Sequence, residues 1–99
     1  MKASQFYAVL RKLRAAGWII KCSDTGWIRL GPPGRNLCKY TPITAVCLFL
    51  KKKDFHWLND SDAGKHLGLT RRMTSMLHKA AFDKSQFGRR KLRENLGLI

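Results

Sequence analysis

Residues 61–81 read SDAGKHLGLTRRMTSMLHKAA and carry the most informative pattern of the chain. A short helix is predicted to end at Leu67, because Gly68 interrupts the helical pattern there. Thr70 is a favourable N-cap for a second helix, which we expect over residues 70–81. The stretch therefore predicts two helices joined by a tight turn.

The second predicted helix has an apolar face and a polar, basic face. At about 100° per residue, one face carries Met73, Leu77 and Ala80, and Met76 lies beside it. The opposite side mixes Arg, Ser, Thr and His, side chains that can contact bases or phosphates in a major groove. The expected base-reading residues are Arg71, Arg72, Thr74, Ser75 and His78.

The charge of the chain points to a polyanionic partner. The 99 residues include 20 Lys+Arg and 6 Asp+Glu, which give a formal net charge of +14 at pH 7. A surplus of this size favours nucleic acid, ahead of an anionic membrane surface or an acidic protein. Phosphate contacts would make the affinity steeply salt dependent, whereas a purely solubilising role would not. The expected phosphate-binding residues are Thr70, Lys79, Lys51, Lys52, Lys53, Arg89, Arg90, Lys91 and Arg93.

Residues 41–82 resemble the generic helix-turn-helix of bacterial and phage regulators, including its winged variant. The Gly-Leu-Thr turn at 68–70 and the arginines that follow it carry this resemblance. Two positions depart from the family pattern: Gly64 stands where the family usually has Ala, and Thr74 where it usually has Val or Ile. An internal Gly costs ~1 kcal/mol relative to Ala, so we expect a weakened first helix. The resemblance implies sequence-preferring binding to double-stranded DNA, as in a transcriptional regulator.

The N-terminal segment predicts one further helix. Phe6, Leu10 and Leu13 recur at i, i+4 and i+7, the spacing of one apolar helix face. Ser4 is a candidate N-cap, and Gly17 suits the left-handed conformation that ends many helices. We expect basic side chains on the remaining faces of this helix.

Two runs of β-branched and aromatic residues follow, WIIKC at 18–22 and WIRL at 27–30. The turn-rich SDTG between them predicts a β-hairpin, which needs a packing partner to be stable. The expected fold is α+β, with an N-terminal α-β-β unit packed on a tri-helical or winged helix-turn-helix. The breaker GPPGRN at 31–36 separates two predicted parts, a helix and hairpin at 1–34 and a DNA-binding part at 35–99.

Within the second part, Thr41 and Pro42 predict the start of an apolar helix that ends at the lysines 51–53. Its apolar stripe comprises Ile43, Val46, Cys47 and Leu50. FHWL at 55–58 predicts a short extended piece, which in a winged helix pairs with a later hairpin. NDSD at 59–62 supplies N-cap residues for the next helix.

The tail at 83–99 has two readings. We expect a helix with Ser85 as its cap and Gly97 as its stop, because Arg and Lys favour helices. The alternative is a wing hairpin with basic strands and its tip at Gly88.

No enzyme constellation is visible in the sequence. None of the acids has a convincing catalytic partner, and Asp60 and Asp62 are explained by helix capping. Cys22, Cys38 and Cys47 lack Cys-x-x-Cys spacing, so we expect reduced, mostly buried thiols and no metal site. We therefore expect neither catalysis nor a cofactor nor a small-molecule ligand.

The order of basic helix, Gly-Trp-Ile and hairpin is loosely similar to small RNA-cleaving toxins of the HicA type. That family depends on a His in the hairpin region, whereas the first His of this chain is His56. The similarity therefore implies a shared fold and no nuclease activity.

Location and partners follow from the same sequence. No apolar run reaches the ~18 residues of a membrane span, and the N-terminus is polar, so we expect a cytoplasmic protein.

One alternative to DNA binding is an RNA-binding module that uses the hairpin aromatics and the basic tail. Another is a small inhibitor of a host nucleic-acid-processing complex. The apolar stripes of the first helix and the hairpin could form a homodimer interface.

Overall fold

The computed structural model describes residues 1–34, 37–51 and 59–99. Within these ranges the chain forms helices and one two-stranded antiparallel sheet, so the expected α+β class is confirmed. The elements in chain order are α1 (Ala3–Ala15), β1 (Ile19–Cys22), β2 (Ile28–Gly31), α2 (Pro42–Lys51), α3 (Asp60–His66), α4 (Arg71–Ala80) and α5 (Arg89–Asn95). The extended piece expected at 55–58 lies outside the described residues, as do Lys52 and Lys53.

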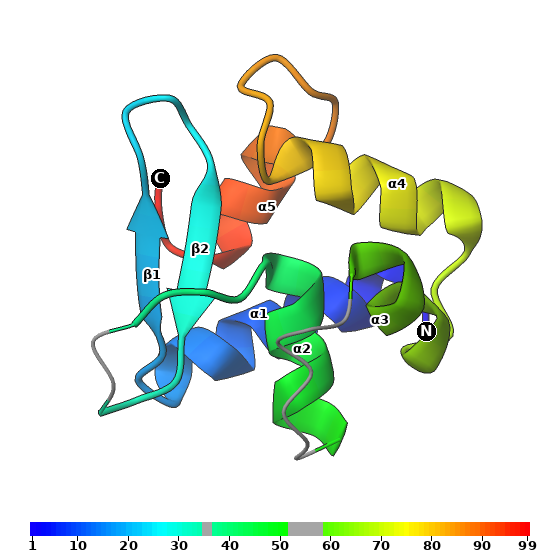
Figure 1. Ribbon diagram of the computed structural model, residues 1–99, viewed down its shortest axis with the longest axis horizontal. Coiled ribbons are helices and arrows are strands. Elements are labelled where there is room, and N and C mark those ends of the chain that lie inside the picture. The colour runs from blue at the N-terminus through cyan, green and yellow to red at the C-terminus, as the bar shows by residue number, and fades with distance from the viewer. Residues whose placement is uncertain (35–36, 52–58) are drawn as a thin grey trace.

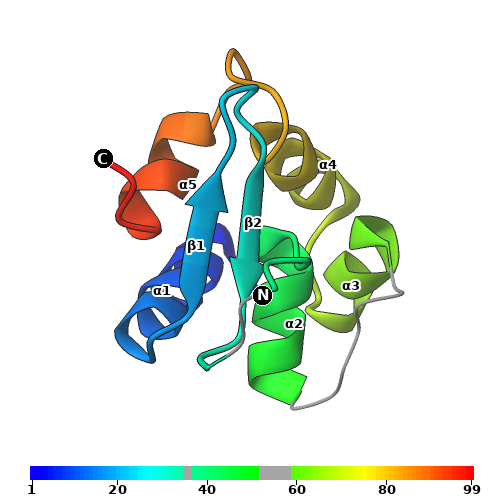
Figure 2. The ribbon, with the colours of Figure 1, turned by 60° about the vertical axis from the view of Figure 1, so that its left-hand side comes forward.

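The helices pack together beside the hairpin, with α1 against α2 and α4 against α5 (Figure 1). Figure 1 shows the hairpin standing at one side of the molecule, with α4 and α3 extending away from it. In the view of Figure 2 the hairpin lies in front, with α1 and α5 seen to one side of it and α2, α3 and α4 to the other. None of the helices in the described part of the chain has the length and apolar character that a membrane crossing requires.

Helix α1 buries the predicted stripe of three apolar residues completely, against α2 and α5. Because this stripe belongs to the core of the chain, it does not offer the dimer interface expected from the sequence. The helix begins at Ala3, so the expected cap at Ser4 is wrong. The backbone amide of Lys2 donates instead to Oε1 of Gln5 at 2.7 Å, which lets the helix start earlier. Gly17 has φ +89° after the last turn, as predicted.

The predicted hairpin is confirmed, and it is anchored to the end of α4. Strands β1 and β2 pair with Ile19 opposite Gly31 and Cys22 opposite Ile28. The side chain of Ile28 is fully buried, and its backbone amide donates to the carbonyl of Ala81 at 2.8 Å. The hairpin therefore holds a fixed position beside the C-terminal end of α4.

One buried core draws on both sides of the GPPGRN breaker. Phe6 and Leu30 come from the first part, and Val46 and Leu92 come from the second. The contacts of α1 with α2 and α5 cross the same boundary. The division into domains at 1–34 and 35–99 stays a prediction, and the two parts share their apolar interior.

Helix α2 begins as the sequence predicts. The amide of Thr44 donates to Oγ1 of Thr41 at 3.1 Å, and the amide of Thr41 donates to Oγ1 of Thr44 at 2.8 Å. Pro42 occupies the first helical position, where its missing N–H leaves no gap. The predicted apolar stripe is buried except for Leu50, which is 41% exposed at the end of the helix. Lys51 is its last, exposed residue.

The tail forms helix α5, so the wing alternative for residues 83–99 is wrong. The helix starts after Gly88, at φ +88°, and Gly97 ends it at φ +73°, as expected. Ser85 is not its cap: the amide and hydroxyl of Ser85 donate to Oδ1 of Asp83 at 2.9 Å and 2.8 Å. These hydrogen bonds hold the pKa of Asp83 below its ordinary value and order the turn after α4.

Helices α3 and α4 meet at the two residues that depart from the family pattern. Gly64 is buried, and a Cβ added to it would overlap Oγ1 of Thr74 and lie 2.7 Å from its Cγ2. Thr74 is 8% exposed, and its Oγ1 donates to the carbonyl of Thr70 at 2.9 Å. The two departures are therefore complementary, since the missing side chain of Gly64 makes room for Thr74.

Gly64→Ala is expected to lower the free energy of unfolding by about 1–3 kcal/mol, because the added methyl group overpacks the α3–α4 contact. Helix propensity alone would predict the opposite sign, a gain of about 1 kcal/mol. Adding Thr74→Ala to this variant should restore part of the loss. Urea denaturation checks both, and a Gly64→Ala variant at least as stable as the parent would contradict this packing.

Candidate nucleic-acid interface

The turn between α3 and α4 has the geometry expected from the sequence. Gly68 adopts φ +70°, and the amide of Leu69 donates to the carbonyl of Gly64 at 2.9 Å. Leu69 is 8% exposed, so it fills the space under the turn. Thr70 is the N-cap of α4, and its Oγ1 accepts a hydrogen bond from the amide of Met73 at 3.1 Å. The turn thus fixes the direction in which α4 leaves α3.

Helix α4 divides into the two faces that were predicted, with one correction. Leu77 and Ala80 are fully buried, and Met73 and Met76 pack partly buried beside them. The expectation that Thr74 lies on the exposed side is wrong, because the close approach of α3 at Gly64 encloses it. The exposed residues of the helix are Arg71, Arg72, Ser75, His78 and Lys79.

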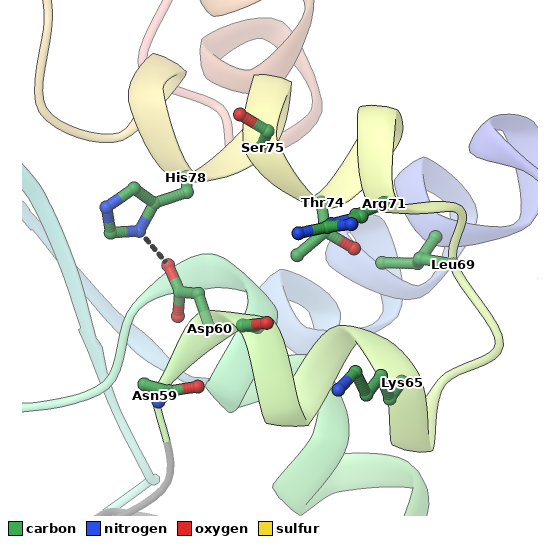
Figure 3. Close-up of a pocket in the computed structure, with 9 residues that line it drawn as sticks. Asn59, Asp60, Lys65, Leu69, Arg71, Thr74, Ser75 and His78 are labelled. Atoms are coloured by element: carbon green, nitrogen blue, oxygen red, sulfur yellow. Dashed lines mark hydrogen bonds and ion pairs between the residues drawn. The ribbon is translucent and has the colours of Figure 1, made fainter.

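A hollow of about 690 Å³ lies between α3 and the exposed face of α4. Figure 3 shows Lys65 and Arg71 toward one end and the pair of Asp60 and His78 toward the other. Lys65, on α3, is exposed and was not among the residues expected from the sequence. The position of Lys65 in the sequence does not indicate a binding role, because Lys65 meets the same hollow as Arg71 only through the packing of α3 on α4.

Asp60 and His78 form a pair that the sequence did not reveal. Nδ1 of His78 lies 2.6 Å from Oδ2 of Asp60, and Oγ1 of Thr41 donates to the other carboxylate oxygen at 2.5 Å. Asp60 is buried, whereas the His78 side chain is half-exposed. A carboxylate accepts hydrogen bonds, so Nδ1 carries a proton and Nε2 lies on the far side of the ring. Asp60 therefore orients His78 on the face of α4.

Asp60→Ala is expected to lower the free energy of unfolding by about 1–3 kcal/mol, because it leaves Thr41 and His78 without their charged acceptor. Asp62→Ala is the matched control, since it removes an acid from the same first turn of α3 without touching this pair. Thermal denaturation of both variants checks the difference. Equal losses of stability in the two variants would show that Asp60 stabilises the protein only as an acid at the start of α3, and not through Thr41 and His78.

The expected phosphate-binding residues do not all reach the face of α4. Thr70 and Lys79 lie on or beside it, and Lys51 is exposed at the far end of α2. Arg90 and Lys91 are exposed on α5, which packs against α1 and α4, and neither residue lines the hollow between α3 and α4. Nε of Arg90 is 3.1 Å from Oε1 of Glu94, and Nζ of Lys91 lies 5.3 Å from the ring centroid of Tyr7.

Two arginines of α5 are used inside the protein. Arg89 is 6% exposed, and its guanidinium donates to the carbonyl of Ala80 at 2.7 Å and to the carbonyl of Gly26. The expectation that Arg89 binds phosphate is therefore corrected, since its donors join α4, the hairpin and α5. Arg93 is half-buried and donates to the carbonyl of Leu98 at 3.3 Å.

The three thiols differ in exposure. Cys47 is buried, and burial raises the pKa of its thiol. Cys38 is half-buried and Cys22 is exposed, so the expectation of mostly buried thiols is wrong for Cys22. Over residues 1–34, 37–51 and 59–99, no cluster of three or more His, Cys, Asp or Glu side chains could hold a metal ion.

Comparison of the chain with protein-family models, with curated proteins and with solved structures found no match. The choice of function therefore depends on the geometry and charge of the side chains. The strongest feature is the exposed basic face of α4, presented by a capped turn and bordered by the hollow against α3.

Proposed function

We propose that this chain is a small basic protein that binds duplex DNA and reads its sequence with α4, as a transcriptional regulator. The observation that carries the proposal is the exposed face of α4, on which Arg71, Ser75 and His78 follow one another along the helix. Helix α4 contains no Asp or Glu. Because Thr70 caps the helix, this row of side chains is held on a regular scaffold rather than on a loop.

The dimensions of α4 suit a major groove. A helix with its side chains is about 10–12 Å across, and the groove is about 12 Å wide. Residues near the start of a recognition helix usually reach the base edges, which assigns that role to Arg71, Arg72 and Ser75. Nε2 of His78 faces away from Asp60 and can meet a base edge or a phosphate. Lys79 flanks the face and is assigned to the backbone.

A winged arrangement belongs to the same proposal. Strands β1 and β2 precede the helix-turn-helix in the chain, whereas a wing usually follows it. The hydrogen bond from Ile28 to Ala81 nevertheless fixes the hairpin beside the C-terminal end of α4. In this position the hairpin can contact the same duplex as α4, as a wing does. We therefore assign the hairpin, rather than the tail, to this role in a cytoplasmic regulator of the phage or plasmid type.

An RNA-binding module is the second candidate. Trp27 is 41% exposed, Phe82 is 36% exposed and Phe87 is 82% exposed. Exposed aromatic rings on a basic surface can stack single-stranded bases without sequence preference. This candidate would move the functional surface from α4 to the hairpin and the loop that follows α4.

Fluorescence anisotropy with a labelled random-sequence duplex and a matched single-stranded RNA, at low and at physiological salt, tests the proposal. We expect duplex binding that persists at physiological salt and is stronger than RNA binding. Selection from a duplex library should then yield a consensus site. Tighter binding to the RNA would favour the RNA-binding module. If neither nucleic acid binds at low salt, the proposal fails, and a protein partner, as for an inhibitor of a nucleic-acid-processing complex, becomes the better explanation.

A further inference from the structure

Arg29, on β2, is held between two exposed aromatic rings. Its guanidinium carbon lies 5.2 Å from the ring centroid of Trp27 and 4.7 Å from that of Phe82. Trp27 comes from the hairpin and Phe82 from the turn after α4. Contacts of a guanidinium with two ring faces restrict its orientation, because each ring attracts the cation over its face.

Arg29 is half-buried and makes few hydrogen bonds within the described part of the chain. One terminal nitrogen is 3.4 Å from the carbonyl oxygen of Ile28, a long hydrogen bond. No ion pair joins Arg29 to an acid in the part of the chain that the structure describes. Because a guanidinium has five N–H donors in its plane, stacking on its faces leaves most of them unpaired. The side chain is thus oriented, and no anion among the described residues neutralises it.

Contacts place Arg29 next to the exposed face of α4. The ring of Phe82 lies 5.0 Å from the ring of His78, the last of the proposed base-reading residues. Arg29, Phe82 and His78 therefore form a continuous row from the hairpin onto α4. The hydrogen bond between Ile28 and Ala81 fixes the distance between the two elements.

The length of α4 determines what Arg29 would meet. Its ten residues span about 15 Å, more than the roughly 12 Å width of a major groove. When the first turn of α4 contacts base edges, its C-terminal end approaches the backbone that borders the groove. A phosphate in that position suits the planar donors of a guanidinium, which match phosphate oxygens in pairs.

We propose that Arg29 binds a backbone phosphate of the duplex that α4 reads, and that Trp27 and Phe82 are positioning residues that hold its guanidinium toward it. This inference rests on the proposed function, and it adds a contact from outside the helix-turn-helix. It assigns to the exposed aromatic rings a role in orienting a cation instead of stacking on bases.

The test compares Arg29→Gln with Lys12→Gln, a control that removes the same charge from an exposed position on α1. Anisotropy titrations of one selected duplex over a range of salt concentrations give the dependence of log K on log salt. For Arg29→Gln we expect the slope to become shallower by about 0.9, the contribution of one phosphate. The affinity should fall about tenfold, the loss of roughly one charged hydrogen bond, with the preferred sequence unchanged. Lys12→Gln should keep the parent slope.

Trp27→Leu and Phe82→Leu test the role of the rings. Both keep the cation, so the salt slope should stay near that of the parent while the affinity falls, and thermal denaturation verifies that the exposed sites tolerate the change. A parent-like slope and affinity for Arg29→Gln, with binding weakened as expected in Arg71→Ala, would overturn this inference alone. Absence of duplex binding by the parent protein would overturn this inference and the proposed function together.

Discussion

Arg71→Ala is expected to bind the selected duplex about 10- to 100-fold more weakly than the parent protein, the cost of losing a guanine contact. Arg71 is the first residue of α4, it is exposed, and it borders the hollow against α3. In this position its guanidinium can donate two parallel hydrogen bonds to one guanine. Discrimination against a changed base at the contacted position should fall by the same factor. Competition titrations with matched and mutated duplexes measure both effects.

Lys79→Ala is the control from the same helix. Lys79 flanks the exposed face at the C-terminal end, so its loss should weaken all duplexes about equally and leave the preferred sequence intact. The fold should survive either substitution, because Thr70 caps the helix and Leu77 anchors it. If Arg71→Ala, Arg72→Ala and Ser75→Ala all retain parent affinity, the assignment of α4 as the reading helix is wrong.

Arg89→Ala is expected to lower the free energy of unfolding by about 2–4 kcal/mol, because it leaves the carbonyls of Ala80 and Gly26 without their charged donor. These carbonyls belong to the end of α4 and to the hairpin turn, so the loss should loosen three elements at once. Arg89 is 6% exposed, and water cannot replace its hydrogen bonds without opening the structure. Urea denaturation measures the change.

Arg90→Ala is the matched control, one position along α5. Its side chain is 87% exposed and, among the described residues, pairs with Glu94 alone, so its removal should change the stability by less than about 1 kcal/mol. Arg89→Lys separates charge from geometry. A single ammonium group reaches both carbonyls less well than a planar guanidinium, so this variant should also be destabilised. Parent-like stability of Arg89→Ala would contradict the structural role of this residue.

Local signals in the sequence were sufficient for the turn and for the faces of α4. The cap at Thr70, the left-handed Gly68 and the buried Leu69 each follow from one residue type in one position. The start of α2 at Thr41 follows from the same kind of rule. In the tail the helix was predicted correctly, but its cap was not, because Ser85 donates hydrogen bonds to Asp83 and lies before the helix.

The remaining features depend on contacts between distant residues. Asp60 and His78 are 18 positions apart, and only the packing of α3 on α4 makes them partners. The same packing buries Thr74, which helical periodicity places at the edge of the exposed face. Arg89 and Gly26 are 63 positions apart, so sequence cannot separate the buried cation from its exposed neighbour Arg90. The pattern of charges in the sequence therefore identified the cationic residues, but it did not predict which of them are exposed and which are buried.

We propose that α4 binds duplex DNA, with the hairpin beside it. The most direct measurement is a titration of the isotopically labelled protein with a short selected duplex, followed by two-dimensional amide NMR. We predict the largest shifts at residues 70–79 and at 27–29, with α1 unaffected. Shifts concentrated on α1 or α5, with residues 70–79 unchanged while the duplex is bound, would show that α4 is not the surface that binds DNA.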